Sequence, residues 1–225
     1  METTIYNYDL EKYNFSKIIA NYLEVDDLSV IEASLGNSNK TSQNSLYKNM
    51  EQSSAYQQLY KCLDSAEGTS FYDTYERFIQ QVIRPQYDEP ILYQKKPTHR
   101  ILFLDTPGIS RFHRDRDYGH STAEINYFVP QTKAFGTNTV WIESKEGMKD
   151  FLPIKANAGQ FARFNGASLE HGAKENKTGK SRVSFDFRVI PVSKTPAKIT
   201  DTSSWQEEDK ENPLFQNAHK FSLCQ

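Results

Sequence analysis

Cysteine is scarce in this chain. Cys62 and Cys224 are the only two cysteines among 225 residues, and they lie far apart in the sequence. A small fold held together by disulfides is therefore not expected, and two reduced thiols are typical of a cytosolic protein. No run of 18 apolar residues occurs, and the opening residues Met-Glu-Thr-Thr-Ile-Tyr lack the basic and apolar segments of a leader. We expect no membrane span and a cytoplasmic location.

A surplus of basic residues is also missing. The 27 Lys and Arg residues are balanced by 29 Asp and Glu residues, which gives a formal net charge of −2 and a pI near 6.2. Proteins that bind nucleic acid or anionic membranes electrostatically carry a basic patch or stripe. We therefore expect no nucleic-acid partner and no membrane partner. Activity on DNA or RNA is correspondingly disfavoured.

The length of the chain suits one domain. A chain of 225 residues can bury one sizeable core, and nothing in it requires a second domain. We expect a single domain over residues 1–225, with a mainly helical part over 1–90, a β core over 91–192 and a polar tail over 193–225. The residues that we expect to anchor that tail are Trp205, Leu214, Phe215 and Phe221.

Apolar residues recur at helical spacing twice in the first ninety residues. The two sets are Phe15, Ile18, Ile19, Tyr22 and Leu23, and Phe71, Tyr75, Phe78 and Val82. The second set follows a cap at Thr69 or Ser70 and ends before Pro85. We predict helices that pack on the outside of a sheet. Residues 36–54 lie between them without apolar periodicity, and we interpret them as a solvated connector, with an active-site lid as the alternative.

From residue 91 the pattern changes to short strands separated by Gly, Pro and Asn turns. The expected strands cover 91–93, 100–104, 110–115, 124–129, 139–143, 160–164, 169–173 and 181–189. Strands of this length and spacing are typical of a double-sheet barrel or jelly roll. The same architecture also serves in sugar-binding and isomerase modules, so function has to come from the site.

Three residues of metal-ligand type form a pattern within this β core. His113 and Asp115 are two apart, and side chains at this spacing point to the same face of a strand. His171 follows 171 − 113 = 58 residues later, in a stretch where glycines predict turns. Two imidazoles and one carboxylate form the facial triad of non-haem Fe(II) oxygenases, which leaves coordination positions open. The pattern predicts an enzyme.

An arginine and a serine complete the pattern. Arg182 lies 182 − 171 = 11 residues after His171, on the next predicted strand, and Ser184 shares its face. The planar guanidinium binds a carboxylate through two parallel hydrogen bonds, and a neighbouring hydroxyl can add a third. The order His-x-Asp, distant His, then Arg-x-Ser resembles the Fe(II)/2-oxoglutarate-dependent oxygenases, whose arginine holds the far carboxylate of 2-oxoglutarate.

The resemblance extends from Phe112 to Pro191 and covers residues 1–95 hardly at all. It rests on His113-Arg-Asp-Arg-Asp-Tyr118-Gly-His120, Glu124-Ile-Asn126-Tyr-Phe-Val-Pro130, Thr137-Asn-Thr-Val-Trp141-Ile-Glu-Ser144 and Ser181-Arg-Val-Ser184-Phe-Asp-Phe-Arg188-Val. These segments look like a bacterial branch of the superfamily that is associated with streptomycin and other amino-sugar biosynthesis, and hence with antibiotic biosynthesis.

The resemblance implies a double-stranded β-helix, which is a cupin-like jelly roll. It implies Fe(II) bound by His113, Asp115 and His171, 2-oxoglutarate chelated to the iron, and Arg182 and Ser184 on its far carboxylate. O₂ then supports oxidation of a substrate C–H bond, with release of succinate and CO₂. Hydroxylation is the default outcome, and desaturation, epimerisation or ring closure are alternatives. The family arrangement favours Asp115 over Asp117, the alternative carboxylate ligand.

Four further residues are candidates for the site. Asn126 could hydrogen-bond 2-oxoglutarate and Trp141 could wall the pocket if their strand faces point inward; otherwise Trp141 is outer packing. His120 is a candidate for orienting substrate or a ligand, with a structural role as the alternative. Arg188 rivals Arg182 for the co-substrate, but its later place in the strand favours a substrate carboxylate or a structural pair.

The expected substrate is a polar small molecule, such as a sugar, an aminocyclitol or an amino-acid-derived intermediate. The candidate pocket positions carry hydrogen-bonding side chains, although not all can face inward: Tyr118, His120, Glu124, Asn126, Asn138 and Glu143. A lipid-like substrate would leave buried side chains of this kind unpaired at about 1–3 kcal/mol each. A protein or peptide hydroxylase of the same superfamily and a non-catalytic, metal-binding cupin-like module are the alternatives. Nothing in the sequence indicates the oligomeric state.

Overall fold

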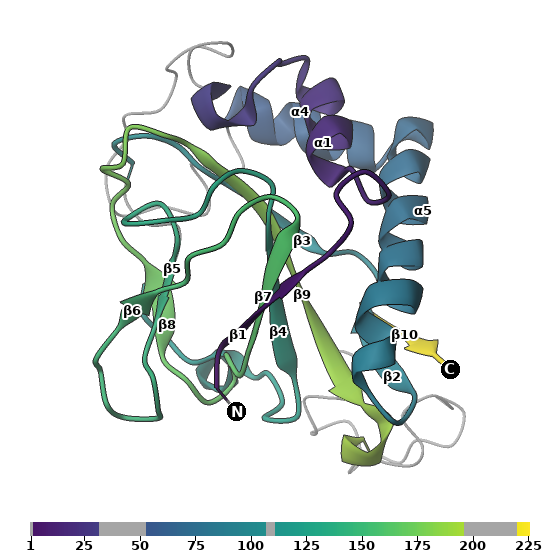
Figure 1. Ribbon diagram of the computed structural model, residues 1–225, viewed down its shortest axis with the longest axis vertical. Helices are drawn as coiled ribbons and strands as arrows, with labels where there is room; N and C mark the ends of the chain where they lie inside the picture. The colour runs from purple at the N-terminus through teal and green to yellow at the C-terminus, as the bar shows by residue number, and fades with distance from the viewer. Residues whose placement is uncertain (1, 32–52, 107–110, 196–219) are drawn as a thin grey trace.

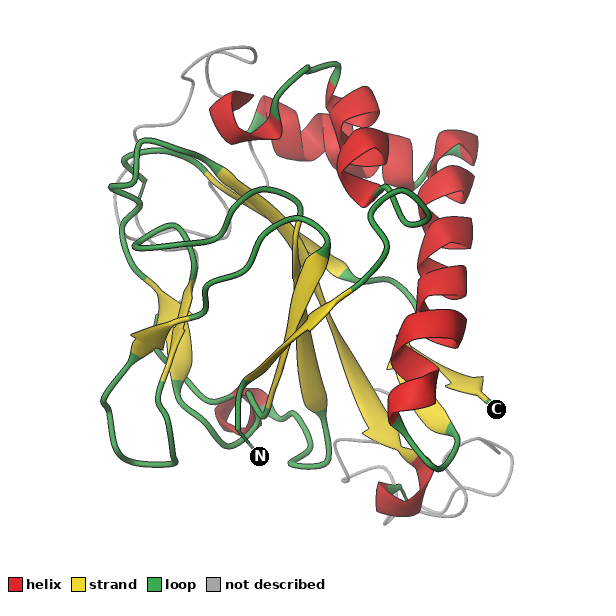
Figure 2. Ribbon diagram, in the orientation of Figure 1, coloured by secondary structure: helices red, strands yellow, loops and turns green. Residues whose placement is uncertain are grey.

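The structure is a computed structural model, and it describes residues 2–31, 53–106, 111–195 and 220–225. In this part of the chain the strands form two sheets, and the helices lie along one side of the larger sheet (Figures 1 and 2). The expected mainly β architecture with helices is confirmed at this level. None of the described helices is long and apolar enough to cross a membrane.

The larger sheet is antiparallel and is organised around one long strand. Its described strands are β1 (Thr4–Asn7), β2 (Ile91–Gln94), β3 (Thr98–Leu102), β4 (Ile125–Pro130), β7 (Gln160–Phe164), β9 (Arg182–Pro191) and β10 (Phe221–Cys224). The strand order is β1-β7-β4-β9-β2-β10. Strand β9 pairs with β4 along one edge and with β3 and then β2 along the other. It is therefore the central strand of the sheet.

The smaller sheet lies on the side of the larger sheet that faces away from the helices (Figure 1). It consists of β6 (Leu152–Pro153), β5 (Val140–Ile142) and β8 (His171–Ala173), in that order. A second, smaller apolar cluster includes residues of both sheets, namely Phe128, Ala162 and Phe164 from the larger sheet and Ile142 from the smaller. This packing places β8, which carries His171, opposite the inner face of the larger sheet.

The helices cover the other face. They are α1 (Phe15–Leu23), α4 (Ser54–Leu63) and α5 (Thr69–Phe78), which continues into a π-helical turn, η3 (Ile79–Ile83). Short 3-10 turns follow the chain at η1 (Leu28–Val30), η2 (Ala66–Gly68), η4 (Arg84–Gln86), η5 (Asp115–Tyr118) and η6 (Val192–Lys194). The side chains of Asn14 and Ser53 cap α1 and α4 by accepting hydrogen bonds from backbone N–H groups in the first turn. Both helices expected from the apolar spacing are present.

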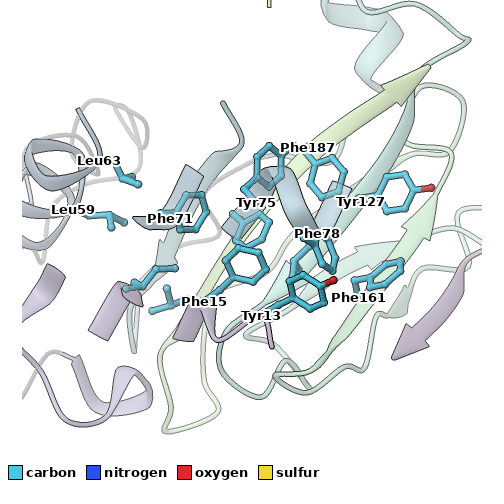
Figure 3. Close-up of a cluster of buried hydrophobic side chains, with 14 of the residues drawn as sticks. Tyr13, Phe15, Leu59, Leu63, Phe71, Tyr75, Phe78, Tyr127, Phe161 and Phe187 are labelled. Atoms are coloured by element: carbon cyan, nitrogen blue, oxygen red, sulfur yellow. The ribbon is translucent and has the colours of Figure 1, made fainter. Parts of the chain in front are cut away.

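Aromatic side chains fill the space between the helices and the larger sheet (Figure 3). Phe15 of α1 packs edge-on against Phe185 of β9 at 5.0 Å between ring centroids, and Tyr127 of β4 stacks on Phe187 at 5.0 Å. Burial of each such side chain contributes about 1.5–3 kcal/mol to stability. The helix-facing side of the sheet is therefore a dry, closely packed support.

Strand β9 separates the two environments by simple alternation. Val183, Phe185, Phe187 and Val189 are fully buried in the aromatic core. The residues between them, Arg182, Ser184, Asp186 and Arg188, must point to the opposite face, because successive side chains of a strand alternate. One strand thus anchors the hydrophobic core and presents charged groups to the interior between the sheets.

Several expectations about elements were wrong. Residues 111–115 do not form a strand: His113 makes an isolated bridge and η5 begins at Asp115. Strands β1 and β10 were not expected, because each is only four residues long and β10 lies in a tail expected to be irregular. Residues 36–52 of the proposed connector or lid lie outside the described residues, and its last residue, Ser54, begins α4. Trp205, Leu214 and Phe215 also lie outside them.

Candidate metal centre

The two candidate histidine ligands are joined through their backbones. The N–H of His113 donates to the carbonyl of His171, and the N–H of His171 donates to the carbonyl of His113, both at 2.9 Å. His171 also pairs with Ile142 on its other side, as the first residue of β8. The ring centroids of the two histidines are 4.7 Å apart as a result. Two residues far apart in sequence are thus fixed as neighbours.

Asp115 brings a carboxylate between the two imidazoles. Its Oδ1 lies 3.4 Å from Nε2 of His113 and 3.6 Å from Nε2 of His171. The three ligand atoms lie within 4.8 Å of one another. Donors about 2.1 Å from a divalent ion and at right angles to one another lie about 3 Å apart, so this set fits one ion with little movement. His113, Asp115 and His171 can hold a metal ion.

The other ring nitrogens of the histidines contact carbonyl groups. Nδ1 of His113 lies 2.6 Å from the carbonyl oxygen of Arg111, and Nδ1 of His171 lies 3.0 Å from that of Leu169. A proton on Nδ1 donates to these carbonyls and leaves the Nε2 lone pairs free for a metal. Burial also lowers the pKa of His171, which favours the neutral, metal-binding form.

The second oxygen of Asp115 accepts hydrogen bonds from two side chains. Asn126 Nδ2 donates to Oδ2 at 2.7 Å, and Arg188 donates to it through Nε at 3.1 Å and Nη2 at 3.0 Å. Burial opposes ionisation of this 3% exposed residue, but the neighbouring imidazole of His113 and the charge of Arg188 hold its pKa well below the usual range. Asp117 instead pairs with Arg114 at the surface, which leaves Asp115 as the carboxylate of the centre.

Arg182 is a buried cation on the same face of β9 as Arg188. It is 1% exposed, its Nε donates to the carbonyl of Asn138 at 2.7 Å, and its Nη1 donates to the hydroxyl of Ser184. Burial, followed by the nearby charge of Arg100, lowers its pKa to about 10. Among the described residues no carboxylate lies within ion-pair distance of Arg182, so its hydrogen-bond partners are neutral.

Glu124, expected from the sequence only as one of the polar pocket positions, extends the charged network. It is 1% exposed, and its Oε2 lies 2.9 Å from Nδ1 of His120 and 3.3 Å from Nε of Arg188. His120, a candidate for orienting substrate or a ligand, thus connects through Glu124 and Arg188 to Asp115. The only sequence signal for this network is the i, i+4 spacing of His120 and Glu124, which is too common to be diagnostic.

The structure gives two other candidates different surroundings. The amide of Asn126 bonds Asp115 and also accepts a hydrogen bond from the N–H of Gly166 at 3.2 Å, so both ends are engaged by the centre itself. Trp141 alternates with Val140 and Ile142, which pack into the cluster between the sheets. Trp141 therefore lies on the outer face, where Lys174 covers its ring at 3.3 Å. Its role as a pocket wall is corrected to outer packing.

The chain is similar to a protein of antibiotic biosynthesis. No established family profile matches it. It is 37% identical over 119 residues to the streptomycin biosynthesis protein StrG of Streptomyces griseus. The match covers 53% of this chain and 56% of StrG, so the chain spans little more than half the length of this relative. The resemblance to proteins of streptomycin biosynthesis that the sequence motifs indicated is confirmed.

Two solved structures illustrate the likeness to known structures. EctD from S. alaskensis with bound Fe has a TM-score of 0.49 at 11% identity, over 86% of this chain and 74% of EctD. The non-haem alpha-ketoglutarate-dependent epimerase SnoN from nogalamycin biosynthesis has a TM-score of 0.45 at 15% identity, over 56% of this chain and 60% of SnoN. TM-scores below 0.5 do not establish a common fold.

Proposed function

We propose that this chain is an Fe(II)- and 2-oxoglutarate-dependent oxygenase that oxidises a C–H bond of a polar small molecule, with release of succinate and CO₂. The observation that carries the proposal is the buried Arg182, which has no carboxylate partner among the described residues. It lies on the same face of β9 as Arg188, which is bound to the candidate metal ligand Asp115. An unpaired buried charge destabilises a protein, so it is retained where a ligand compensates it.

The pairing of the interior arginines supports this co-substrate. Arg100 pairs with Asp186, and Arg188 pairs with both Asp115 and Glu124. Among the described residues no carboxylate lies within ion-pair distance of Arg182, and one carboxylate of 2-oxoglutarate would supply that partner. The keto-acid end of the same molecule would then be free to reach the ion.

Each residue of the centre then has a defined task. Fe(II) bound to His113, Asp115 and His171 would supply activation of O₂ and of the keto acid. Arg182 donates N–H groups to the far carboxylate of 2-oxoglutarate, and Ser184 holds the guanidinium and adds its hydroxyl. Phe128, whose ring lies 5.4 Å from the Arg182 guanidinium, keeps water from this end of the interior.

The proposal includes a finer statement of the fold. We propose that the two sheets form a double-stranded β-helix and that residues 1–225 make one oxygenase domain, located in the cytoplasm. Support comes from β1 and β10, which both pair into the larger sheet although they lie at opposite ends of the described chain. The site then lies between the sheets, where His171 of the smaller sheet meets the inner face of the larger.

The proposed substrate is a polar metabolite of natural-product or sugar metabolism. The similarity to StrG, whose name places it in streptomycin biosynthesis, supports this class. The charged groups beside the centre, Glu124 with His120 and Arg188, support it as well, because an apolar substrate would remove water from them without offering a hydrogen bond in return. Hydroxylation is the proposed outcome, and desaturation, epimerisation or cyclisation would begin from the same centre.

The test is 2-oxoglutarate-dependent oxygen uptake and succinate formation with Fe(II). The panel comprises amino sugars, aminocyclitols, nucleosides, amino acids and peptides, and Asp115→Ala serves as the inactive control. Stimulation by a polar metabolite supports the proposal. Turnover of peptides alone favours a peptide hydroxylase. Binding of Mn²⁺ without binding of 2-oxoglutarate, measured by calorimetry, would reduce the chain to a metal-binding cupin-like module.

A further inference from the structure

The two oxygens of Asp115 have different surroundings. Oδ1 faces the Nε2 atoms of His113 and His171 at 3.4 and 3.6 Å. Oδ2 points away from them and accepts three N–H groups, one from Asn126 and two from Arg188, at 2.7 to 3.1 Å. A carboxylate binds divalent ions through one oxygen or through both. In this arrangement only Oδ1 is available.

We propose that Arg188, assisted by Asn126, is a positioning residue that makes Asp115 a one-oxygen ligand and thereby keeps a coordination position open. For Oδ2 to reach the ion, it would have to give up charge-assisted hydrogen bonds to a guanidinium inside the protein, which are stronger than bonds between neutral groups. A ligand that used both oxygens would occupy a position that the co-substrate or O₂ requires. The inference therefore rests on the metal site of the proposed function.

Both positioning side chains are themselves held in place. Arg188 and Asn126 face each other across the β9–β4 ladder, and Glu124 Oε2 lies 3.3 Å from Nε of Arg188, the same atom that donates to Asp115. Asn126 Oδ1 accepts the N–H of Gly166, while the carbonyl of Gly166 accepts the N–H of Asp115 at 2.9 Å. The loops on either side of the centre are thus tied to the same strand pair, so the orientation of Asp115 is fixed before any ion arrives.

An alternative role for Arg188 predicts the opposite result. If the guanidinium acted only through its charge, it would repel a divalent ion, and its removal would strengthen metal binding. If it orients Asp115, its removal weakens binding, because partners of metal ligands typically contribute 10- to 100-fold to metal affinity. The sign of the change in affinity separates the two roles.

The test uses Mn²⁺ alone with the full chain, without 2-oxoglutarate. Titration gives the dissociation constant, and water-proton relaxation gives the number of exchangeable water molecules on the bound ion. Arg188→Met and Arg188→Lys should each raise the dissociation constant about 10- to 100-fold, and Arg188→Met should lower the water number by one. Asn126→Ala should raise the dissociation constant by a smaller factor and lower the average water number by less than one.

The matched control is Arg100→Lys, which alters an arginine on the same sheet face that is paired with Asp186. Its affinity for Mn²⁺ should stay within about twofold of the original chain, well under the 10-fold expected at the centre. Unchanged affinity and water number in both Arg188 variants would overturn the inference, as would tighter binding with an unchanged water number in Arg188→Met. Failure of the original chain to bind Mn²⁺ would instead contradict the proposed function.

Arg188→Lys keeps a cation between Asp115 and Glu124, and thermal unfolding shows whether each variant folds.

Discussion

Gly166 and Asn126 fit together so closely that no side chain can be added between them. A Cβ built on Gly166 would lie 2.8 Å from the amide group of Asn126, nearer than real Cβ contacts come. The Gly166 N–H donates to Asn126 Oδ1, and its carbonyl accepts the N–H of Asp115. Gly166 therefore links the turn that leads toward His171 to the turn that carries Asp115.

Gly166→Ala should displace the Asn126 amide and with it Oδ2 of Asp115. We expect a loss of about 1–3 kcal/mol in the free energy of unfolding, as for other overpacked sites, together with weaker Mn²⁺ binding. Gly147→Ala is the control. Nothing lies within 4 Å of a Cβ at Gly147, but its φ of +81° disfavours alanine, so that variant should lose stability without losing Mn²⁺ affinity. Equal Mn²⁺ affinities in the two variants would contradict the proposed link.

Replacing His113, Asp115 or His171 with alanine should abolish Mn²⁺ binding and Fe(II)-dependent succinate formation. The three side chains supply all the metal-ligand atoms of the cluster found among the described residues, so no described group can replace them. The fold should persist, because the aromatic core lies on the other face of the larger sheet. Circular dichroism checks the fold. Unchanged succinate formation in all three variants would refute the assignment.

Arg182→Met should weaken 2-oxoglutarate binding and stabilise the protein in its absence. Loss of a two-bond contact with a carboxylate should raise the 2-oxoglutarate dissociation constant roughly 10- to 100-fold or more. Replacing a buried, unpaired guanidinium by an apolar side chain of similar length should raise the free energy of unfolding of the ligand-free protein by about 1–2 kcal/mol. Calorimetry and thermal unfolding with and without 2-oxoglutarate measure both effects. A loss of stability without ligand would indicate a structural arginine.

His99 should make stability depend on pH. Its ring is buried against Phe71 and Phe185, and neither nitrogen has a hydrogen-bond partner among the described residues. Burial lowers its pKa from 6.5 to about 3. Between these values the unfolded chain binds a proton that the folded chain does not, so stability falls as the pH falls, by up to about 1.4 kcal/mol per unit.

The corresponding variant is His99→Phe. It should remove this contribution to the pH dependence. The difference in free energy of unfolding between the variant and the original chain should therefore shift in favour of the variant by about 2 kcal/mol from pH 7.5 to pH 5. Phe15→Leu, which alters the same aromatic cluster through Phe71 and Phe185 and not at the His99 ring, should shift stability equally at both pH values. Urea unfolding at the two pH values provides the measurement. A pH dependence that His99→Phe leaves unaltered would show that the ring titrates normally.

The cluster of candidate metal ligands could be predicted from sequence, because the chemistry and spacing of His113 and Asp115 are local signals and a distant histidine of the right type completes them. The spacing of Arg182 after that histidine made it a candidate for the co-substrate in the same way. The roles of Asn126 and Trp141 could not be settled, because strand alternation shows which residues share a face and leaves open which face is inside. Arg188 could be placed only when register showed it opposite Asn126. Strands β1 and β10 were not predicted, because an edge strand of four residues shows little hydrophobic alternation.

The alternation along β9 limits how this protein can change in length. Ser184 faces the charged interior and Phe185 faces the aromatic core. Each following residue of the strand lies on its face only because side chains alternate with a period of two. One residue inserted between Ser184 and Phe185 would turn Arg188 toward the helices and Phe187 toward the candidate metal centre. Related chains can therefore exchange side chains along this strand, while insertions and deletions should be confined to the turns at its ends.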